Sequence, residues 1–183
     1  GAKVIGLSND IPTKPAHFDL IKNNLKNDLR IDIKNAEAVY STIYKIHPDF
    51  IFHLAAQPIV LDSYQNPLNT FNTNTIGTAN ILDALRLINH KCIAIMITSD
   101  KCYDNIEKTY GYLETDSLGG KDPYSGSKGA AELVIRSYVQ SFFKNSTSNV
   151  RVGVGRAGNV IGGGDWALYR IIPDCMRSWS KNK

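Results

Sequence analysis

The sequence predicts a doubly wound α/β fold built on a mostly parallel sheet. Short apolar runs alternate along the chain with longer stretches of helical period, which is typical of successive β–α–β units. No internal repeat or low-complexity linker interrupts this alternation. A chain of 183 residues with a hydrophobic share of 43% is also long enough to form one domain with a sizeable core. The pattern leaves the order of the strands open.

The first half of the chain contains three expected strands and one helix. The strands cover residues 3–7, a short segment near 29–31, and the buried run 50–54. Between the second and third strands, Ala36, Val39 and Ile43 recur on one helical face, so we expect a helix there. Pro48 cannot continue a helix, and the periodic stretch therefore ends before it.

The second half of the chain alternates in the same way. We expect a long helix over residues 69–88, a strand over 92–98, a polar loop over 100–122, a strand over 150–155 and a last helix over 168–180. Asp122 followed by Pro123 is typical of a helix start, because aspartate caps free backbone N–H groups and proline fits the first turn. The helix that begins there has an apolar face that includes Ala131 and Ile135.

Composition and charge exclude several classes of protein. The formal charge of +4 comes from scattered Lys and Arg without a basic run, so we expect no nucleic-acid partner. The apolar runs are too short to cross a bilayer and residues 1–5 lack the layout of a signal peptide, so we expect a cytoplasmic protein without a membrane partner. Three cysteines, isolated from one another and from histidine, predict free thiols and no metal site: Cys92, Cys102 and Cys175.

Tyr124 and Lys128 form the first candidate catalytic pair. They lie four residues apart near the start of the expected helix, so their side chains project from one face and can meet. An ammonium close to a phenol favours the phenolate, and such a pair can supply a base near neutral pH. The same spacing also occurs on ordinary solvated helix faces, so the pair gains meaning only from its surroundings.

Those surroundings include the residues that follow two predicted strands. Ser99, Asp100 and Lys101 bring a hydroxyl, a carboxylate and an ammonium to the carboxyl end of strand 92–98, where open α/β sheets bind ligands. An ordinary polar turn is the alternative for this segment. Residues 53–57 end another strand with small side chains, which let a flat ligand approach the backbone.

One segment, Gly153-x-Gly155-x-x-Gly158, matches the letters of the dinucleotide-binding fingerprint, and we reject it as a cofactor loop. Its first glycine lies within an expected strand, and no helix opens at Gly158. A loop on the substrate side is the better interpretation, with Asn159 as a polar contact.

Together these segments resemble the extended short-chain dehydrogenase/reductase family that acts on sugar nucleotides, over nearly the whole chain. Dehydratases are the most similar members, because Ser99-Asp100-Lys101 stands where related dehydratases have Thr-Asp-Glu and where epimerases lack an acid/base pair. The motifs that carry the resemblance are Ala55-Ala56-Gln57-Pro58, Ser63-Tyr64 with Pro67, Asn74 with Gly77-Thr78, residues 98–104, residues 119–129 and residues 156–167.

The resemblance implies dehydration of a nucleotide-activated hexose, with oxidation at C4, loss of water across C5 and C6, and hydride return to C6. Tyr124 would take the proton of the 4-hydroxyl, and Lys128 would support the phenolate and hold the nicotinamide ribose. Ser99 would hydrogen-bond the developing ketone. Lys101 and Asp100 would serve as the base at C5 and the acid at the departing 6-hydroxyl.

The resemblance also implies NAD as cofactor, a nucleotide sugar as substrate and a homo-oligomer, either a dimer or a tetramer. Cofactor contacts would come from Asp32, Ile33, Leu54, Ala55, Ala56, Asn74, Tyr124 and Lys128, and substrate contacts from Gln57 and Asn159. The choice of NAD over NADP rests mainly on the resemblance. Ser8 follows the strand where an acid often binds ribose, and Asp10 comes late for that role.

The chain departs from the family pattern at both ends. Residues 3–7 match the second strand of the family fold, so its first strand, its glycine-rich loop and its C-terminal substrate lobe are missing. We therefore expect residues 1–183 to form a partial Rossmann domain, with the start of the substrate-binding region from about residue 159. Because the missing strand would lie between 3–7 and 50–54, we hypothesise that the isolated chain neither folds stably nor binds NAD tightly, and is inactive. A cooperative melt with micromolar NAD affinity would contradict this hypothesis.

Two other interpretations stay open. The chain could come from a 4-epimerase or from a dehydratase for another nucleotide sugar, although Asp100 and Lys101 beside Tyr124 argue against an epimerase. It could also be a non-catalytic nucleotide-sugar or NAD-binding protein that kept the fold. The Tyr, Lys and hydroxyl that such a protein would lose are all present. The sequence does not identify the base of the nucleotide.

Overall fold

The computed structural model describes residues 1–182, which form two compact units. The larger unit covers Ile33–Gly158, and the smaller one joins Gly1–Asp32 to the chain from Asn159 onward. Within the described residues, no helix combines the length and apolar character needed to span a membrane. All three cysteines are free thiols, as the sequence predicts.

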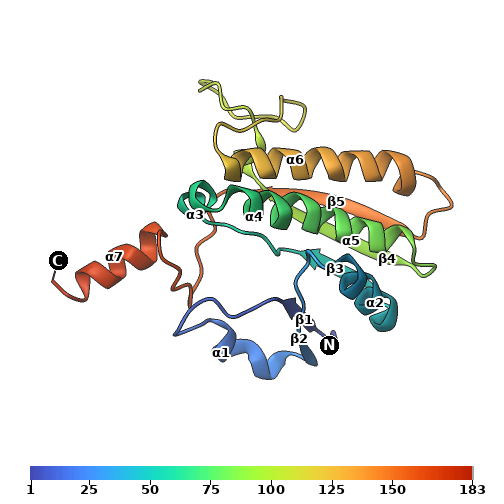
Figure 1. The fold of residues 1–183 in the computed structure, drawn as a ribbon, viewed down its shortest axis with the longest axis horizontal. Helices are drawn as coiled ribbons and strands as arrows, with labels where there is room; N and C mark the ends of the chain where they lie inside the picture. The colour runs from blue at the N-terminus through green and yellow to red at the C-terminus, as the bar shows by residue number, and fades with distance from the viewer. Residues whose placement is uncertain (183) are drawn as a thin grey trace. The chain divides into compact units, whose positions relative to one another are not determined.

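The larger unit is a three-stranded parallel sheet with helices (Figure 1). The strands follow the spatial order β3 (Phe50–His53), β4 (Cys92–Ser99), β5 (Val150–Ala157). The helices are α2 (Ala36–Ile46), α3 (Val60–Gln65), α4 (Pro67–Phe71), α5 (Gly77–Arg86) and α6 (Pro123–Tyr138), with a 3-10 turn at Asp100–Cys102 and π-turns at Asn72–Ile76 and Val139–Phe143. Parallel strands joined by helices confirm the predicted α/β fold.

The core of this unit lies between the sheet and its helices. Alternate residues of β4 are buried, including Ala94 and Met96, which are fully enclosed. Figure 1 shows α5 and α6 running side by side along the sheet, and α6 contacts β4 while α2 packs on α5. Leu82 of α5 and Ile135 of α6 fill the interface. Burying each such side chain contributes about 1.5–3 kcal/mol to folding.

The long helix predicted over residues 69–88 contains a π-turn near its start. α4 ends at Phe71, a π-turn follows over Asn72–Ile76, and α5 begins at Gly77. The Thr78 hydroxyl donates to the carbonyl of Asn74 at 2.7 Å. In a regular α-helix that carbonyl accepts only a backbone N–H, so the side chain competes for it. The widened turn points Asn74 into the protein. Helix α3, before α4, was not expected from the sequence.

Two of the three glycines of the rejected fingerprint, Gly153 and Gly155, lie inside β5, which confirms that the first glycine is within a strand. A Cβ atom on Gly153 would meet Ile95 Cδ1 at 3.2 Å, and one on Gly155 would meet Ile97 Cδ1 at 3.1 Å. The glycines therefore make room for the isoleucines of the neighbouring strand β4.

The smaller unit contains a second parallel ladder, in which β1 (Ile5–Ser8) pairs with β2 (Asn27–Arg30). The strand expected near 29–31 therefore lies slightly earlier. The remaining elements are α1 (Phe18–Ile21), a 3-10 turn at Lys22–Asn24 and α7 (Ile171–Trp179). Among residues 1–182, β1 pairs only with β2, and β3 pairs only with β4. Strands β1 and β3 therefore each have one unpaired edge.

Candidate active site

Helix α6 begins as the sequence predicts and carries the Tyr-Lys pair. The Asp122 carboxylate accepts hydrogen bonds from the backbone N–H of Ser125 at 3.0 Å and from its hydroxyl at 2.6 Å, and Pro123 fills the first turn. Tyr124 lies in that turn, and Lys128 follows one turn later. The Lys128 ammonium is 6.0 Å from the centroid of the Tyr124 ring, which confirms that the two side chains share one face.

The Lys128 ammonium is held in an environment that disfavours its charge. Lys128 is 7% exposed, and burial lowers its pKa. His53, at the end of β3, is also buried, and its pKa falls to about 4, first because of burial and second because Lys128 is near. His53 is therefore neutral at pH 7. Among residues 1–182, no carboxylate is bonded to Lys128 Nζ, so its donors can reach a ligand hydroxyl.

Ser99, Asp100 and Lys101 form one hydrogen-bonded group where β4 ends. The Ser99 hydroxyl donates to Asp100 Oδ1 at 3.1 Å and accepts from the backbone N–H of Lys101 at 3.2 Å. Lys101 Nζ lies 2.9 Å from Asp100 Oδ2, an ion pair. Ser99 is buried, while the Lys101 and Asp100 side chains are 49% and 44% exposed. The turn thus anchors a hydroxyl and presents an acid and a base to solvent.

Close backbone approach brings this turn to α6. Cys102 ends the turn, and its carbonyl accepts from the N–H of Gly119 at 2.9 Å. A Cβ atom on Gly129 of α6 would lie 2.9 Å from the Gly119 carbonyl oxygen and 3.4 Å from that of Cys102. Glycine at 129 therefore lets the helix of Tyr124 and Lys128 pack directly on the segment of Ser99. Asp100 and Lys101 line a cleft of about 970 Å³ that α6 and β5 also border.

Asn74 is predicted to contact the cofactor and Gln57 to contact the substrate, and the two residues are hydrogen-bonded to each other. Asn74 Oδ1 accepts from the Gln57 N–H at 2.8 Å, and Asn74 Nδ2 donates to the Gln57 carbonyl at 3.1 Å and to Ser127 Oγ at 2.9 Å. The Gln57 side-chain amide donates to the Ile59 carbonyl and to Thr70 Oγ1, each at 3.0 Å. Asn74 therefore fixes the loop after β3 against α6, and the Gln57 side chain fixes the same loop against α4.

The remaining cofactor-side predictions of the larger unit lie around that loop. Leu54 is 68% exposed, and Ala55 and Ala56 are half-buried, so the loop offers small and apolar side chains. Ile33 is buried, a Cβ atom on Gly77 would lie 2.5 Å from its Cδ1, and its carbonyl accepts from Asn80 Nδ2 at 2.9 Å. Its side chain therefore packs on α5. Asp32 and Asn159 belong to the smaller unit, where Asn159 is exposed.

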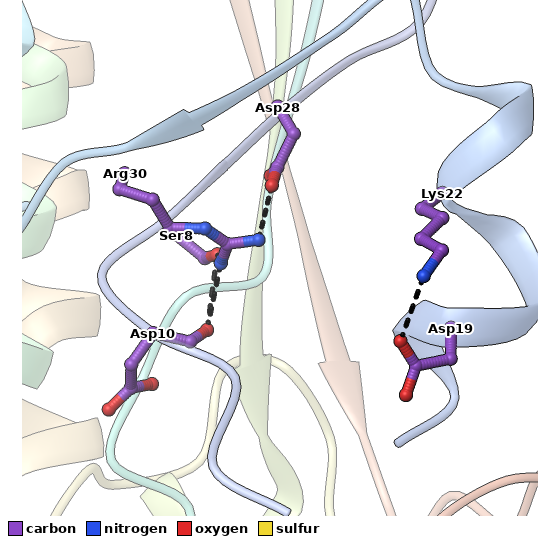
Figure 2. A network of polar contacts seen from close by, with 6 residues as sticks. All are labelled: Ser8, Asp10, Asp19, Lys22, Asp28 and Arg30. Atoms are coloured by element: carbon purple, nitrogen blue, oxygen red, sulfur yellow. Dashed lines mark hydrogen bonds and ion pairs between the residues drawn. The ribbon is translucent and has the colours of Figure 1, made fainter. Parts of the chain in front are cut away.

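In the smaller unit, Arg30 occupies the end of the β1–β2 ladder (Figure 2). Its guanidinium donates to Ser8 Oγ, to the Asp10 carbonyl at 3.0 Å and to the Asp28 carboxylate. It also lies 4.9 Å from the centroid of the Phe18 ring. Asp10 enters the network through its backbone, and its carboxylate points away from Arg30 (Figure 2). The Ser8 hydroxyl is thus the side-chain group that β1 itself contributes to this cluster.

Sequence reasoning missed a layer of residues behind the catalytic candidates. Polar side chains link the elements of the site, namely the buried Thr78, Thr98, Ser127 and Glu132 and the half-buried Arg156. One signal could have found Glu132, because it lies eight residues after Tyr124 and so shares its helix face. The others pair across elements distant in sequence, which no local spacing indicates.

Comparison with known proteins gives matches along the whole chain. A family model described as GDP-mannose 4,6 dehydratase matches residues 2–152. The chain is 45% identical over 188 residues to a CDP-glucose 4,6-dehydratase from Salmonella typhimurium, covering 100% of this chain and 52% of the relative. It is 33% identical to a CDP-paratose 2-epimerase from Salmonella typhi, covering 75% of this chain and 44% of the relative. The chain thus spans about half the length of the curated relatives it matches.

Solved structures share the fold. The X-ray structure of Pal from Bacillus thuringiensis matches with a TM-score of 0.79 and 28% identity, covering 98% of this chain and 56% of that one. A dTDP-glucose 4,6-dehydratase from Streptomyces venezuelae, solved with NAD bound, matches with a TM-score of 0.84 and 20% identity, covering 98% and 53%. The latter likeness shows the Rossmann-like fold alone.

Proposed function

Because the chain belongs to the GDP-mannose 4,6 dehydratase family, we propose that its protein dehydrates a nucleotide-activated hexose to a 4-keto-6-deoxy sugar. We propose CDP-glucose as the substrate, on the basis of 45% identity to a CDP-glucose 4,6-dehydratase. The product would enter deoxysugar synthesis in the cytoplasm, such as that of lipopolysaccharide O-antigens, and the protein would work as a homo-oligomer. The paired acid and base at Asp100 and Lys101 carry the proposal.

The Tyr-Lys pair begins the reaction by moving a proton at the 4-hydroxyl. Tyr124 accepts that proton through its phenol oxygen, and the Lys128 ammonium lies on the same face of α6, 6.0 Å from the centre of the Tyr124 ring. NAD, held beside Tyr124 and Lys128, would supply the hydride acceptor for C4 and the hydride donor for C6. Ser99, whose hydroxyl lies at the end of β4, donates a hydrogen bond to the ketone oxygen that forms at C4.

Asp100 and Lys101 then remove water across C5 and C6. The 2.9 Å contact between Lys101 Nζ and Asp100 Oδ2 provides a path along which one proton converts the ion pair into a neutral amine and a carboxylic acid. The amine takes the C5 proton, which the C4 ketone acidifies, and the acid gives its proton to the departing 6-hydroxyl. The pair ends as an ammonium and a carboxylate, so it is reset for another turnover. A 4-epimerase needs no such pair, and dehydration is therefore favoured.

The residues around Tyr124 fit NAD. The Lys128 ammonium is buried without a bonded carboxylate in the described chain, and a ribose diol would satisfy its donors. The apolar loop after β3, with Leu54, Ala55 and Ala56, offers a flat wall for the cofactor. Asn74 supports this wall through its hydrogen bonds to Gln57. We propose that Asp32 and Ile33 hold the adenine and that Asn159 contacts the sugar nucleotide.

Incubation of the full-length protein that carries this chain with CDP-glucose and, separately, with dTDP-glucose tests the proposal. We expect the 4-keto-6-deoxy product from CDP-glucose, detected by mass spectrometry as loss of one water from the hexose. Tyr124→Phe removes the proton acceptor and should lower kcat at least about 10²-fold. Turnover of neither sugar nucleotide would refute the dehydratase assignment, and turnover of dTDP-glucose alone would refute the choice of base.

A further inference from the structure

Glu132 lines the same cleft as Asp100 and Lys101, and its carboxylate is bonded to two strands, β4 and β5. Glu132 is 6% exposed and Thr98 is 7% exposed. Glu132 Oε1 accepts from Thr98 Oγ1 and from Arg156 Nε, the latter at 3.1 Å, while Oε2 accepts from Arg156 Nη2 at 3.0 Å. This bidentate pair raises the pKa of Arg156. Both carboxylate oxygens of Glu132 are thus engaged within the protein.

The partners of Glu132 lie on both sides of the Ser99–Lys101 segment. Thr98 directly precedes Ser99 and stands opposite Arg156 in the β4–β5 ladder. The Arg156 guanidinium also lies 4.8 Å from the centroid of the Tyr103 ring. Tyr103 directly follows the turn that contains Asp100 and Lys101. The segment is therefore held at its start by Thr98 and at its end by Tyr103.

Glu132 shares its helix face with the Tyr-Lys pair. Tyr124, Lys128 and Glu132 are spaced by four residues along α6, so they lie one above another. A single helix thus carries the phenol, the ammonium and the carboxylate that fixes the end of β4. Any rotation of α6 that moved Tyr124 would also strain the bonds of Glu132.

We propose that Glu132, acting through Thr98 and Arg156, is a positioning residue that sets the Ser99–Lys101 turn against Tyr124. This inference rests on the proposed dehydration. Glu132 has no role in proton transfer to substrate, because both of its carboxylate oxygens already accept hydrogen bonds from Thr98 and Arg156. A buried ion pair adds little net stability compared with apolar packing, so its main effect is on geometry.

Glu132→Gln in the full-length protein is the direct test. The amide puts an N–H₂ group in place of one carboxylate oxygen, so at least one of the three bonds from Thr98 and Arg156 is lost. A displacement of about 1 Å at a reaction centre lowers the rate about 10²-fold, and we expect a fall in kcat of that order with little change in the KM for the sugar nucleotide. Glu114→Gln is the matched control, because the Glu114 side chain is exposed and its backbone carbonyl keeps the 3.2 Å bond from Arg156.

A pair of Thr98 variants separates positioning from folding. Thr98→Ser keeps the hydroxyl donor and should restore wild-type kcat, whereas Thr98→Val removes the donor at similar volume and should lower kcat. Both are measured on folded protein, below the Tm of each variant. If Glu132→Gln does not fold, the Thr98 pair decides the question.

Two outcomes would overturn the inference while leaving the proposed function intact. The first is that the wild-type protein is active and folded Glu132→Gln has the same kcat. The second is that Thr98→Ser and Thr98→Val have equal kcat values. A wild type that turns over neither sugar nucleotide would instead contradict the proposed function.

Discussion

His53 Nε2 lies 3.0 Å from the hydroxyl oxygen of Thr78, inside the core behind Lys128. The Thr78 hydroxyl has one proton, and it donates that proton to the Asn74 carbonyl at 2.7 Å. The imidazole therefore donates from Nε2, which identifies the neutral tautomer of His53. This donor fixes the end of β3 against the first turn of α5.

A neutral buried histidine makes stability depend on pH. The pKa of His53 is about 4 in the folded protein against 6.5 in the unfolded chain, so the unfolded chain binds more protons between these values. The free energy of unfolding should be unaffected by His53 above pH 6.5 and should fall by on the order of 3 kcal/mol as the pH drops toward 4. Urea unfolding at several pH values measures this. His53→Asn should flatten the dependence, and an equal slope in the variant would contradict the assignment.

Asn74 should matter for stability as well as for the site. Asn74→Leu keeps the volume but leaves the Gln57 N–H and the Ser127 hydroxyl without their partner, at a cost of about 3 kcal/mol. Asn72→Leu, in the same π-turn and half-buried, is the control. Chemical unfolding of both variants gives the comparison. Equal losses would mean that the network around Asn74 contributes nothing specific.

Two glycines of α6 should respond in opposite directions to alanine. At Gly129 a Cβ atom would meet the Gly119 carbonyl oxygen at 2.9 Å, so Gly129→Ala must push the segment away and should destabilise by about 1–3 kcal/mol. At Gly126 the nearest atom is 3.4 Å away, and alanine there should stabilise the helix by up to about 1 kcal/mol. Tm values of the two variants test this. Matching shifts would show that the close approach at Gly129 is unimportant.

The active-site pair makes separate steps measurable. Lys101→Met removes the base at C5 and should lower solvent deuterium exchange at that carbon by at least about 10²-fold. Oxidation at C4, which needs Tyr124 and Ser99, should survive. Mass spectrometry of the sugar measures exchange, and absorbance of the reduced cofactor measures oxidation. Undiminished exchange at C5 would assign the base elsewhere.

Thiol reactivity should follow burial. Cys92 and Cys102 are buried, and burial raises the pKa of each to about 11, so neither forms thiolate readily at pH 8. Cys175 is half-buried. Alkylation followed by peptide mass mapping should therefore label Cys175 first and the other two after unfolding. Early labelling of Cys102 would mean that the segment around the turn opens readily.

Local signals in the sequence explain which elements could be predicted. Asp122 and Pro123 determine the start of α6 through contacts within a few residues, and that start is confirmed. The π-turn at Asn72–Ile76 could not be predicted, because it accompanies a Thr78 hydroxyl bond and an Asn74 side chain that reaches Ser127, 53 residues away. Gln57 was predicted to face the substrate, and its side chain is bonded to Ile59 of its own loop and to Thr70 of α4. That role remains a prediction.

The spacing of Tyr124, Lys128 and Glu132 also limits how α6 can vary in length. Each residue turns an α-helix by about 100°, so a one-residue deletion between Lys128 and Glu132 would rotate the carboxylate about a quarter turn away from Arg156. Deletions or insertions in this stretch would separate the phenol from the strand it faces, whatever residue was added or removed. Insertions and deletions between related chains should therefore occur mainly in the exposed turns after residue 143, where they leave the spacing of Tyr124, Lys128 and Glu132 unchanged.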